Sequence, residues 1–338
     1  MTLSPLLMLP GFASLQISNK GLIRWLARTI PAGMLALLLA LPGSMAQAQA
    51  RSFSFGVIGQ AERAGSGAQA LRNALEESGR ERLMFVVVNG LKSSSEPCTD
   101  RLYTERRELL DEARQTVIVS LGAGDWARCR RDDGSSAAID RLARVREIFF
   151  TEASSAAQST SFNLADPTSS ELTITRQSAT VQFRDYAENM RWHTGGVLFA
   201  TINLPGNNNN YIADAGRNSE FEDRIIANRF WMQRLARAAK QKKARALVLF
   251  VDGDPLLQAK ARKSALGGRS DGYADFRRHL RELTSHYTGR VLLVHNAQGR
   301  SVTTTLNWRG NFGEMILGTG WTQVTVGPRA TFSIKPGA

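Results

Sequence analysis

Short apolar runs that end in polar or glycine-rich turns are the feature that most constrains the fold of this chain. Residues 83–88, 116–121, 246–251 and 290–295 are six-residue runs dominated by Val, Leu, Ile and Phe. Continuous apolar runs of this length are typical of strands that are buried on both faces of a sheet. Segments with helical spacing separate several of these runs. The order strand, helix, strand, helix, strand therefore predicts an α/β fold built on layered sheets.

The remaining elements follow from the same patterns. Residues 53–59 alternate and then turn, as an opening strand does, and residues 196–203 resume the sheet. Short alternating strands are expected between residues 301 and 332. We find no internal repeat, and we predict one domain over residues 51–338 with a layered β-sandwich flanked by helices. The expected helices are 66–80, 101–113, about 136–150, 219–242 and about 271–286.

A polar segment interrupts this pattern at about residues 151–182. Residues 151–161 hold six Ser or Thr in eleven positions and have no periodicity. Such a composition is typical of an exposed loop, so we expect an insertion here and no packed element.

The first fifty residues read as a secretory signal peptide. Lys20, Arg24 and Arg28 precede an apolar run over 34–41, and alternating alanines end at Ala50. A membrane anchor is the alternative, but this run is shorter than the roughly 20 residues that a spanning helix needs. We expect cleavage near Ala50, with residues 1–19 as a further N-terminal extension. The mature chain, in which we see no other segment able to span a bilayer, is predicted to be periplasmic or secreted.

Composition excludes several classes of protein. A hydrophobic content of 43% with 22% charged residues excludes a disordered chain, and two cysteines are too few for a disulfide scaffold or a four-cysteine zinc site. Residues 1–50 contain three of the 43 basic residues and no acid, so 40 basic and 30 acidic residues remain, a net charge of +10. For an exported chain this charge makes an anionic ligand or an envelope polymer a better candidate partner than nucleic acid, but the scattered arginines favour a solvated surface.

Polar or glycine-rich turns follow most of the predicted strands. In open α/β sheets, the functional site lies beyond the carboxyl ends of the strands, so these turns are its expected location. They are Gly59-Gln-Ala-Glu62, Asn89-Gly-Leu-Lys92, Gly122-Ala-Gly-Asp-Trp126, the segment 203–210, Asp252-Gly-Asp-Pro255 and His295-Asn-Ala-Gln-Gly299.

The order and spacing of these turns resemble the calcineurin-like metallophosphoesterases, in an exported bacterial branch, over about residues 53–326. The best markers are Lys92-Ser-Ser-Ser-Glu-Pro-Cys-Thr-Asp-Arg-Leu-Tyr103 and Gly122-Ala-Gly-Asp-Trp126 with Cys129. Residues 191–201 with the following asparagines, and Val291-Leu-Leu-Val-His295, support them. The resemblance implies a calcineurin-like phosphoesterase fold and a site in which two metal ions activate water against a phosphate ester.

The residues that this chemistry requires are mostly replaced. The resemblance implies metal-binding acids, amides and imidazoles at positions where this chain has Gln60, Gly90, Gly124 and Asn203. A neutral amide or a glycine cannot offset the repulsion between two divalent ions. The acids and imidazole that remain near these turns are Asp125, Asp252, Asp254 and His295. Asp125 and His295 are the residual catalytic candidates, and Asp252, Asp254 and His295 are weak metal-ligand candidates.

Two functions are compatible with this degenerate site. The first is a catalytically inactive homologue, a pseudoenzyme with a binding or scaffold role and no cofactor. The second is an active metal-dependent phosphoesterase that hydrolyses phosphomonoesters or phosphodiesters at a displaced or mononuclear site and needs divalent metal ions. We favour the first. His295 has a structural alternative as a hydrogen-bonded strand-end residue, and the Asp252–Asp254 segment has one as a simple turn.

A disulfide is predicted between Cys98 and Cys129. Two cysteines stand in a chain that is expected to enter an oxidising compartment, and each follows the turn after one of two successive strands. Loops that leave the same edge of a sheet can bring two cysteines within the roughly 5.5 Å Cα separation that a bridge needs. The resembled branch has cysteines at both positions, which supports the pairing. Two buried free thiols are the alternative.

Overall fold

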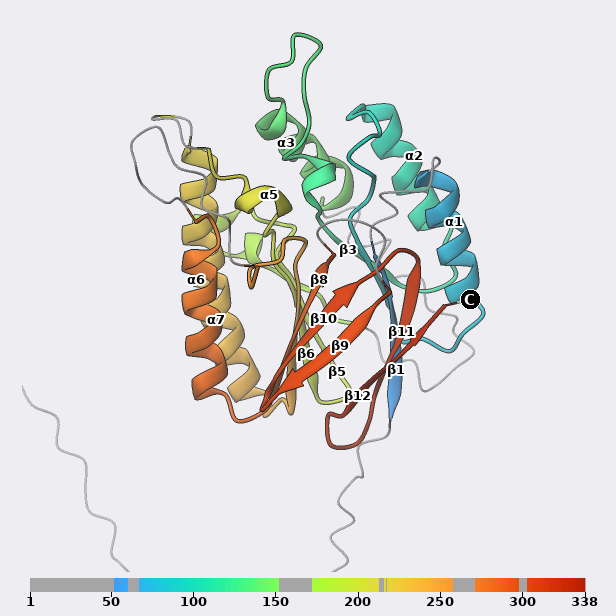
Figure 1. The fold of residues 1–338 in the computed structure, drawn as a ribbon, viewed down its shortest axis with the longest axis vertical. Helices are drawn as coiled ribbons and strands as arrows, with labels where there is room; N and C mark the ends of the chain where they lie inside the picture. The colour runs from blue at the N-terminus through green and yellow to red at the C-terminus, as the bar shows by residue number, and fades with distance from the viewer. Residues whose placement is uncertain are drawn as a thin grey trace, which may run out of the picture. The chain divides into compact units, whose positions relative to one another are not determined.

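Two β-sheets stack face to face between two groups of helices (Figure 1). This computed structural model describes residues 52–59, 67–151, 172–212, 216, 218–257, 271–297 and 303–337. Ala50–Ala338 form one compact unit. The predicted signal peptide, Gln60 and most of the predicted insertion lie outside the described residues.

The first sheet has five strands in the order β12-β11-β1-β2-β3. Its first three strands along the chain are parallel, whereas β11 pairs antiparallel with β1, and β12 with β11. Every residue of β2 and β3 is buried, as their continuous apolar sequences predict. The strands are β1 (Phe53–Ile58), β2 (Val86–Asn89), β3 (Val117–Ser120), β11 (Trp321–Val326) and β12 (Phe332–Pro336).

The second sheet has seven strands in the order β4-β5-β6-β7-β8-β10-β9. β6, β7, β8 and β10 are parallel, so their carboxyl ends lie at one edge of the sheet. The strands are β4 (Thr175–Arg176), β5 (Met190–Thr194), β6 (Val197–Thr201), β7 (Ala246–Phe250), β8 (Arg290–Asn296), β9 (Thr305–Arg309) and β10 (Phe312–Leu317).

Helices cover the outer face of each sheet. α1, α2 and α3 lie beside the five-stranded sheet, and α6 and α7 lie beside the seven-stranded sheet (Figure 1). Each of these five helices has a buried apolar face, because its apolar residues recur at helical spacing. Their bounds are α1 (Gly67–Ser78), α2 (Asp100–Asp111), α3 (Ala138–Phe149), α6 (Ser219–Gln241) and α7 (Ala274–His286). Short helical turns are η1 (Ala123–Asp125), η2 (Gln177–Ala179), η3 (Val181–Phe183) and α5 (Gly206–Asn209).

Alternate residues of one strand contribute to two different cores. On β8, Leu292 and Val294 belong to the core that both sheets share, whereas Val291 and Leu293 pack with residues of α6 and α7. Because successive side chains of a strand point to opposite faces, this division defines an inner and an outer face of the seven-stranded sheet. The same alternation decides on which side of the sheet each strand-end residue lies.

The predicted α/β class, a layered β-sandwich flanked by helices, is confirmed. The predicted absence of packed elements in 151–182 is wrong for its described end, because β4 and η2 form there and Leu172 and Gln177 are buried, although Val181 is exposed. β5 was not expected as a separate strand, although its residues alternate between buried and half-buried. Within the described ranges, no helix is both long and apolar enough to cross a bilayer.

Candidate functional site

The predicted turns come together where the carboxyl ends of the parallel strands of the two sheets meet. The Asn89 amide, at the end of β2, donates to the Val251 carbonyl after β7 at 2.9 Å. The Asn296 amide, at the end of β8, donates to the Asn89 carbonyl at 3.1 Å. Two segments more than two hundred residues apart in sequence thus bridge the sheets at the expected place.

Asp125 holds the turn that follows β2. Its fully buried carboxylate accepts hydrogen bonds from the backbone N–H groups of Leu91 at 2.9 Å, Lys92 at 3.1 Å and Gly122 at 2.7 Å. Burial raises the pKa of Asp125 to about 7, although the Gly122 hydrogen bond and the positive charge of Lys92 oppose the shift. Asp125 therefore connects the turn after β2 to the turn after β3 through hydrogen bonds.

Asp252 has the same role between the two sheets. Its Oδ2 accepts from the backbone N–H groups of Ala123 and Gly206, each at 2.7 Å. Its Oδ1 accepts from the Asn296 amide at 2.8 Å. Asp252 is 2% exposed, and its carboxylate is surrounded by donors of the chain itself.

The two glycines at expected ligand positions cannot accept a ligand side chain without rearrangement. Gly90 has a φ of 101°, a conformation that residues with a Cβ rarely adopt. A Cβ at Gly124 would lie 2.9 Å from the Lys92 carbonyl oxygen. The local backbone therefore differs from one that presents an acid or an imidazole at these positions.

Asn203 is also committed to the protein. Its amide nitrogen Nδ2 donates to Glu188 Oε1 at 2.9 Å, and its backbone N–H donates to the Asn189 side chain at 2.7 Å. Glu188 in turn pairs with Arg146 through two hydrogen bonds. The Oδ1 atoms of Asn89 and Asn203 are buried without a hydrogen-bond partner among the described residues.

His295 is buried and faces two carboxylates. Its Nε2 lies 3.0 Å from Glu314 Oε1 and 4.0 Å from Asp254 Oδ1, while its Nδ1 lies 3.0 Å from the Asn296 carbonyl oxygen. Burial alone lowers the pKa of His295, but the Glu314 hydrogen bond and the Asp254 charge outweigh burial and raise it. The hydrogen bond with His295 in turn lowers the pKa of Glu314.

The four acid and imidazole candidates are thus divided between two clusters. Asp125 and Asp252 belong to the hydrogen-bonded network between the sheets, whereas Asp254 and His295 form a separate cluster with Glu314. Glu314, which was not among the predicted candidates, lies in an alternating strand of the C-terminal tail. Only the pairing of β10 with β8 places it beside His295.

The predicted disulfide between Cys98 and Cys129 is confirmed. The two Cα atoms are 5.9 Å apart, and the bridge links positions 31 residues apart. The Tyr103 hydroxyl lies nearby and donates to the Asp125 carbonyl at 2.7 Å. The bridge therefore links the segment just before α2, which contains Cys98, to the segment just after the turn that contains Asp125.

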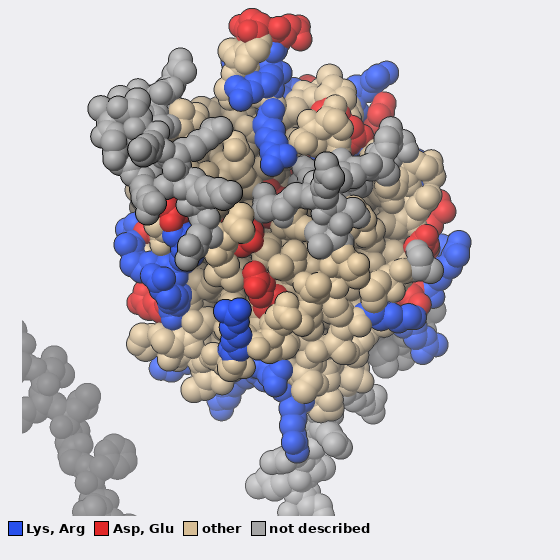
Figure 2. Space-filling model, in the orientation of Figure 1, with Lys and Arg blue, Asp and Glu red and all other residues tan. Residues whose placement is uncertain are grey.

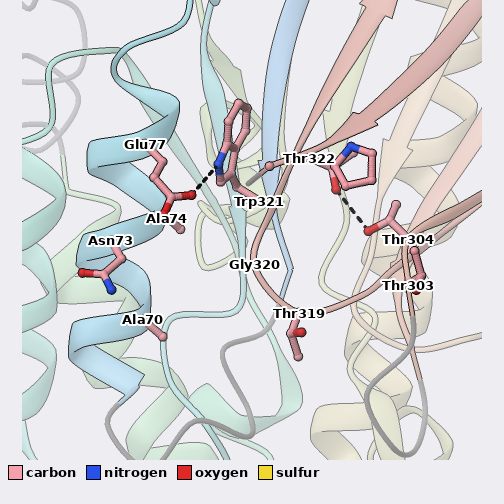
Figure 3. Close-up of a pocket in the computed structure, with 12 residues that line it drawn as sticks. Ala70, Asn73, Ala74, Glu77, Thr303, Thr304, Thr319, Gly320, Trp321 and Thr322 are labelled. Carbon is pink, nitrogen blue, oxygen red and sulfur yellow. Dashed lines mark hydrogen bonds between the residues drawn. The ribbon is translucent and has the colours of Figure 1, made fainter.

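A pocket of about 450 Å³ lies between α1, the start of β11 and the end of β12 (Figure 3). Trp321 donates to Glu77 across it at 3.0 Å, and Thr322 contacts Thr304 at 3.1 Å. None of the described candidate site residues lines it. Its lining is Ala70, Asn73, Ala74, Glu77, Thr303, Thr304, Thr319, Gly320, Trp321, Thr322, Pro336 and Gly337.

The fold is similar to several solved structures, including these two. One is GAP50, the anchor in the inner membrane complex of Plasmodium, with a TM-score of 0.46, 11% identity, and coverage of 85% of this chain and 84% of that one. The other is a dimetal phosphatase from Danio rerio, with a TM-score of 0.44, 12% identity, and coverage of 85% and 99%. No protein-family model and no curated protein matches the chain. Its function is therefore inferred from its own residues.

Proposed function

We propose that this protein is an exported calcineurin-like phosphoesterase homologue that has lost its dimetal centre and its hydrolase activity and acts by binding. One observation carries the proposal. Asp125 and Asp252, the acids at the strand ends that meet between the sheets, together accept at least six hydrogen bonds from the chain itself. Five of the donors are backbone N–H groups, which cannot move away without a change in the fold.

Metal binding by these carboxylates would be expensive. An ion that took over the Asp252 oxygens would leave the N–H groups of Ala123 and Gly206 buried without an acceptor. Each unsatisfied buried donor costs about 1–3 kcal/mol. The ion would also need further ligands, but Gly90 and Gly124 offer no side chain and Asn203 is bound to Glu188. The residues present therefore do not fit a pair of metal ions.

Export is supported by two independent features. The leader over residues 1–50 has the charge and apolar pattern of a signal peptide. The Cys98–Cys129 bridge is of a kind that persists in oxidising compartments such as the periplasm or the extracellular space. We therefore place the mature protein in one of these compartments.

The net charge favours an anionic partner. Lys and Arg side chains are spread around the margins of the face in Figure 2 and do not gather in one patch. A distributed positive charge attracts polyanions at long range without defining a site. We propose an anionic envelope polymer as the partner class, and we do not propose nucleic acid, which an exported chain is not expected to meet.

The test is a hydrolysis assay on purified mature protein with a generic phosphomonoester and a generic phosphodiester, each with Mn²⁺ or Zn²⁺. We expect no turnover above the metal-only background. The His295→Gln variant, purified identically, controls for contaminating phosphatases. Metal-dependent turnover that disappears in this variant would establish the competing function, an active phosphoesterase with a displaced mononuclear site.

A further inference from the structure

We propose that Asp254, His295 and Glu314 form a binding site for one divalent transition-metal ion. The site goes beyond the proposed function, which concerns the turns between the two sheets. The expectation of no cofactor treated Asp254 and His295 as weak metal-ligand candidates and did not include Glu314.

The ligand atoms have separations that suit a shared ion. His295 Nε2 is 3.0 Å from Glu314 Oε1 and 4.0 Å from Asp254 Oδ1, and one atom from each residue lies within 4.8 Å of the others. Two ligand atoms that are each about 2.1 Å from one ion lie roughly 3.0 to 4.2 Å apart. The two His295 distances lie within this range, and the 4.8 Å limit on the third exceeds it by only 0.6 Å.

The imidazole is held in the orientation that a metal ligand requires. The Asn296 carbonyl oxygen can only accept, so Nδ1 carries the proton of their 3.0 Å hydrogen bond. Metal-binding histidines commonly donate their second ring N–H to a backbone carbonyl in this way. Nε2 is thereby directed at the two carboxylates.

Asp254 is positioned by its own turn. Its Oδ1 accepts from the backbone N–H groups of Leu256 at 2.8 Å and Leu257 at 3.0 Å. These two bonds use the lone pairs of Oδ1 and orient the carboxylate, so its second oxygen, Oδ2, is the one that would bind the ion. Glu314 is half-buried, and its position on β10 is set by strand pairing, which places Ile316 opposite His295. All three residues are therefore placed by backbone structure.

The cluster lies on the outer face of the seven-stranded sheet. His295 lies on the same face of β8 as Val291 and Leu293, which pack with α6 and α7. The neighbouring Asn296 points to the other face and joins the hydrogen-bonded network of Asn89, Asp125 and Asp252 between the sheets, here called the inner network. The proposed ion would therefore be independent of the Asp125–Asp252 network.

One nitrogen and two carboxylate oxygens select the kind of ion. Imidazole suits Zn²⁺, Co²⁺ and their neighbours and is a poor ligand for Mg²⁺ or Ca²⁺, which prefer all-oxygen sites. We therefore infer a borderline first-row ion of the Zn²⁺ type, with its remaining positions open to water. The competing occupant is a proton on Nε2, which would make the cluster a buried ion pair.

His279 provides a matched control in the same molecule. It also lies between an aspartate and a glutamate, but Asp275 is 3.5 Å from Nε2 and Glu282 is 3.3 Å from Nδ1. Because these two nitrogens point away from each other, the two acids cannot share an ion with one ring nitrogen. Similar side chains are thus present at both places, but only the His295 cluster converges.

The experiment is a Co²⁺ titration of metal-stripped mature protein, followed by visible absorption and by equilibrium dialysis. We expect one Co²⁺ per chain, displaced by Zn²⁺. His295→Gln should abolish this binding, Glu314→Gln should weaken it roughly tenfold to a hundredfold, and His279→Gln should leave it unchanged. Circular dichroism establishes which variants are folded. If His295→Gln does not fold, the half-buried Glu314→Gln decides.

The proposal is overturned if folded wild-type protein binds no Co²⁺ at millimolar concentration. It is equally overturned if binding is unaffected by His295→Gln, or by Glu314→Gln where that variant decides. The proposed function fails differently, through hydrolytic turnover. One ion without turnover supports both proposals, one His295-dependent ion with turnover supports only the metal site, and neither ion nor turnover supports only the loss of activity.

Discussion

Asp252 and Asp254 stand two residues apart on the turn after β7, and each accepts two backbone N–H bonds on one oxygen, but Asp252 also accepts on its other oxygen and lies between the sheets. Asp252 lies between the sheets and accepts from two backbone N–H groups and from Asn296. Asp254 faces the outer cluster, where His295 lies 4.0 Å away and a second acid, Glu314, contacts the same imidazole. A carboxylate surrounded by fixed donors is a structural element, whereas one that shares an imidazole with another acid retains capacity for a ligand.

The largest expected difference is between alanine variants of these two residues. Asp252→Ala leaves buried N–H groups of two turns without an acceptor and should lower the free energy of unfolding by about 3 to 5 kcal/mol. Asp254→Ala removes the local capping of Leu256 and Leu257 and one of the two carboxylates near His295, and should cost about 1 kcal/mol. Denaturant unfolding of both variants provides the measurement. Equal losses would break the distinction between a structural and an available carboxylate.

The pH dependence of stability sharpens the same distinction at Asp125. Its pKa is raised from 3.8 to about 7 by burial, so the folded state keeps a proton that the unfolded state releases within this window. Stability should therefore fall by a few kcal/mol as the pH rises from about 4 to about 7, and change little from this group above that. Urea unfolding at several pH values measures this slope.

Asp125→Asn should make the dependence of unfolding free energy on pH flatter than in wild type, because an asparagine side chain does not titrate. The exposed Asp185→Asn serves as the control and should leave the slope unchanged. An identical slope in wild type and Asp125→Asn would show that Asp125 is ionised throughout this range.

Removal of the disulfide tests how much the bridge contributes to the stability of the inner network. The bridge closes a loop between positions 31 residues apart, so the double variant Cys98→Ser, Cys129→Ser should lose about 2–4 kcal/mol of unfolding free energy. Thermal unfolding under non-reducing conditions measures the loss. His295-dependent Co²⁺ binding should persist in the folded double variant, because the bridge contacts the inner network. If the double variant lost both stability and Co²⁺ binding, the Asp254–His295–Glu314 cluster would depend on the network around Asp125 and Asp252.

The smallest expected effect comes from Gly124→Ala. The added Cβ would lie 2.9 Å from the Lys92 carbonyl oxygen, and relieving this contact should cost about 1–3 kcal/mol. Gly134→Ala is the comparison, because its Cβ would meet nothing within 4 Å and only its φ of 79° is unfavourable. Chemical denaturation of both variants provides the measurement. If Gly124→Ala had the same free energy of unfolding as wild type, the turn could accept a ligand side chain after all.

Much of the fold could be predicted from the sequence because burial leaves a local pattern. The run at 246–251 is apolar throughout and forms β7, and the spacing of apolar residues in 219–242 corresponds to α6 within one residue. The site was harder to predict. Asp125, Asp252, Asp254 and His295 were found because they follow strands, but the pattern does not say which donors surround each one. Glu314 was missed, because its partner is 19 residues away on a neighbouring strand.

The sequence by itself determined the order of elements, the layered α/β class and the two cysteines able to pair, because these depend on periodicity, length and composition. Only the tertiary structure decided that Asp252 is closed by backbone donors and that Asp254 meets His295 and Glu314. The reason is physical: hydrophobic patterning is local along the chain, whereas the environment of a carboxylate depends on strand pairing and on which face of a sheet each side chain occupies. Two acids in one turn can therefore have opposite roles.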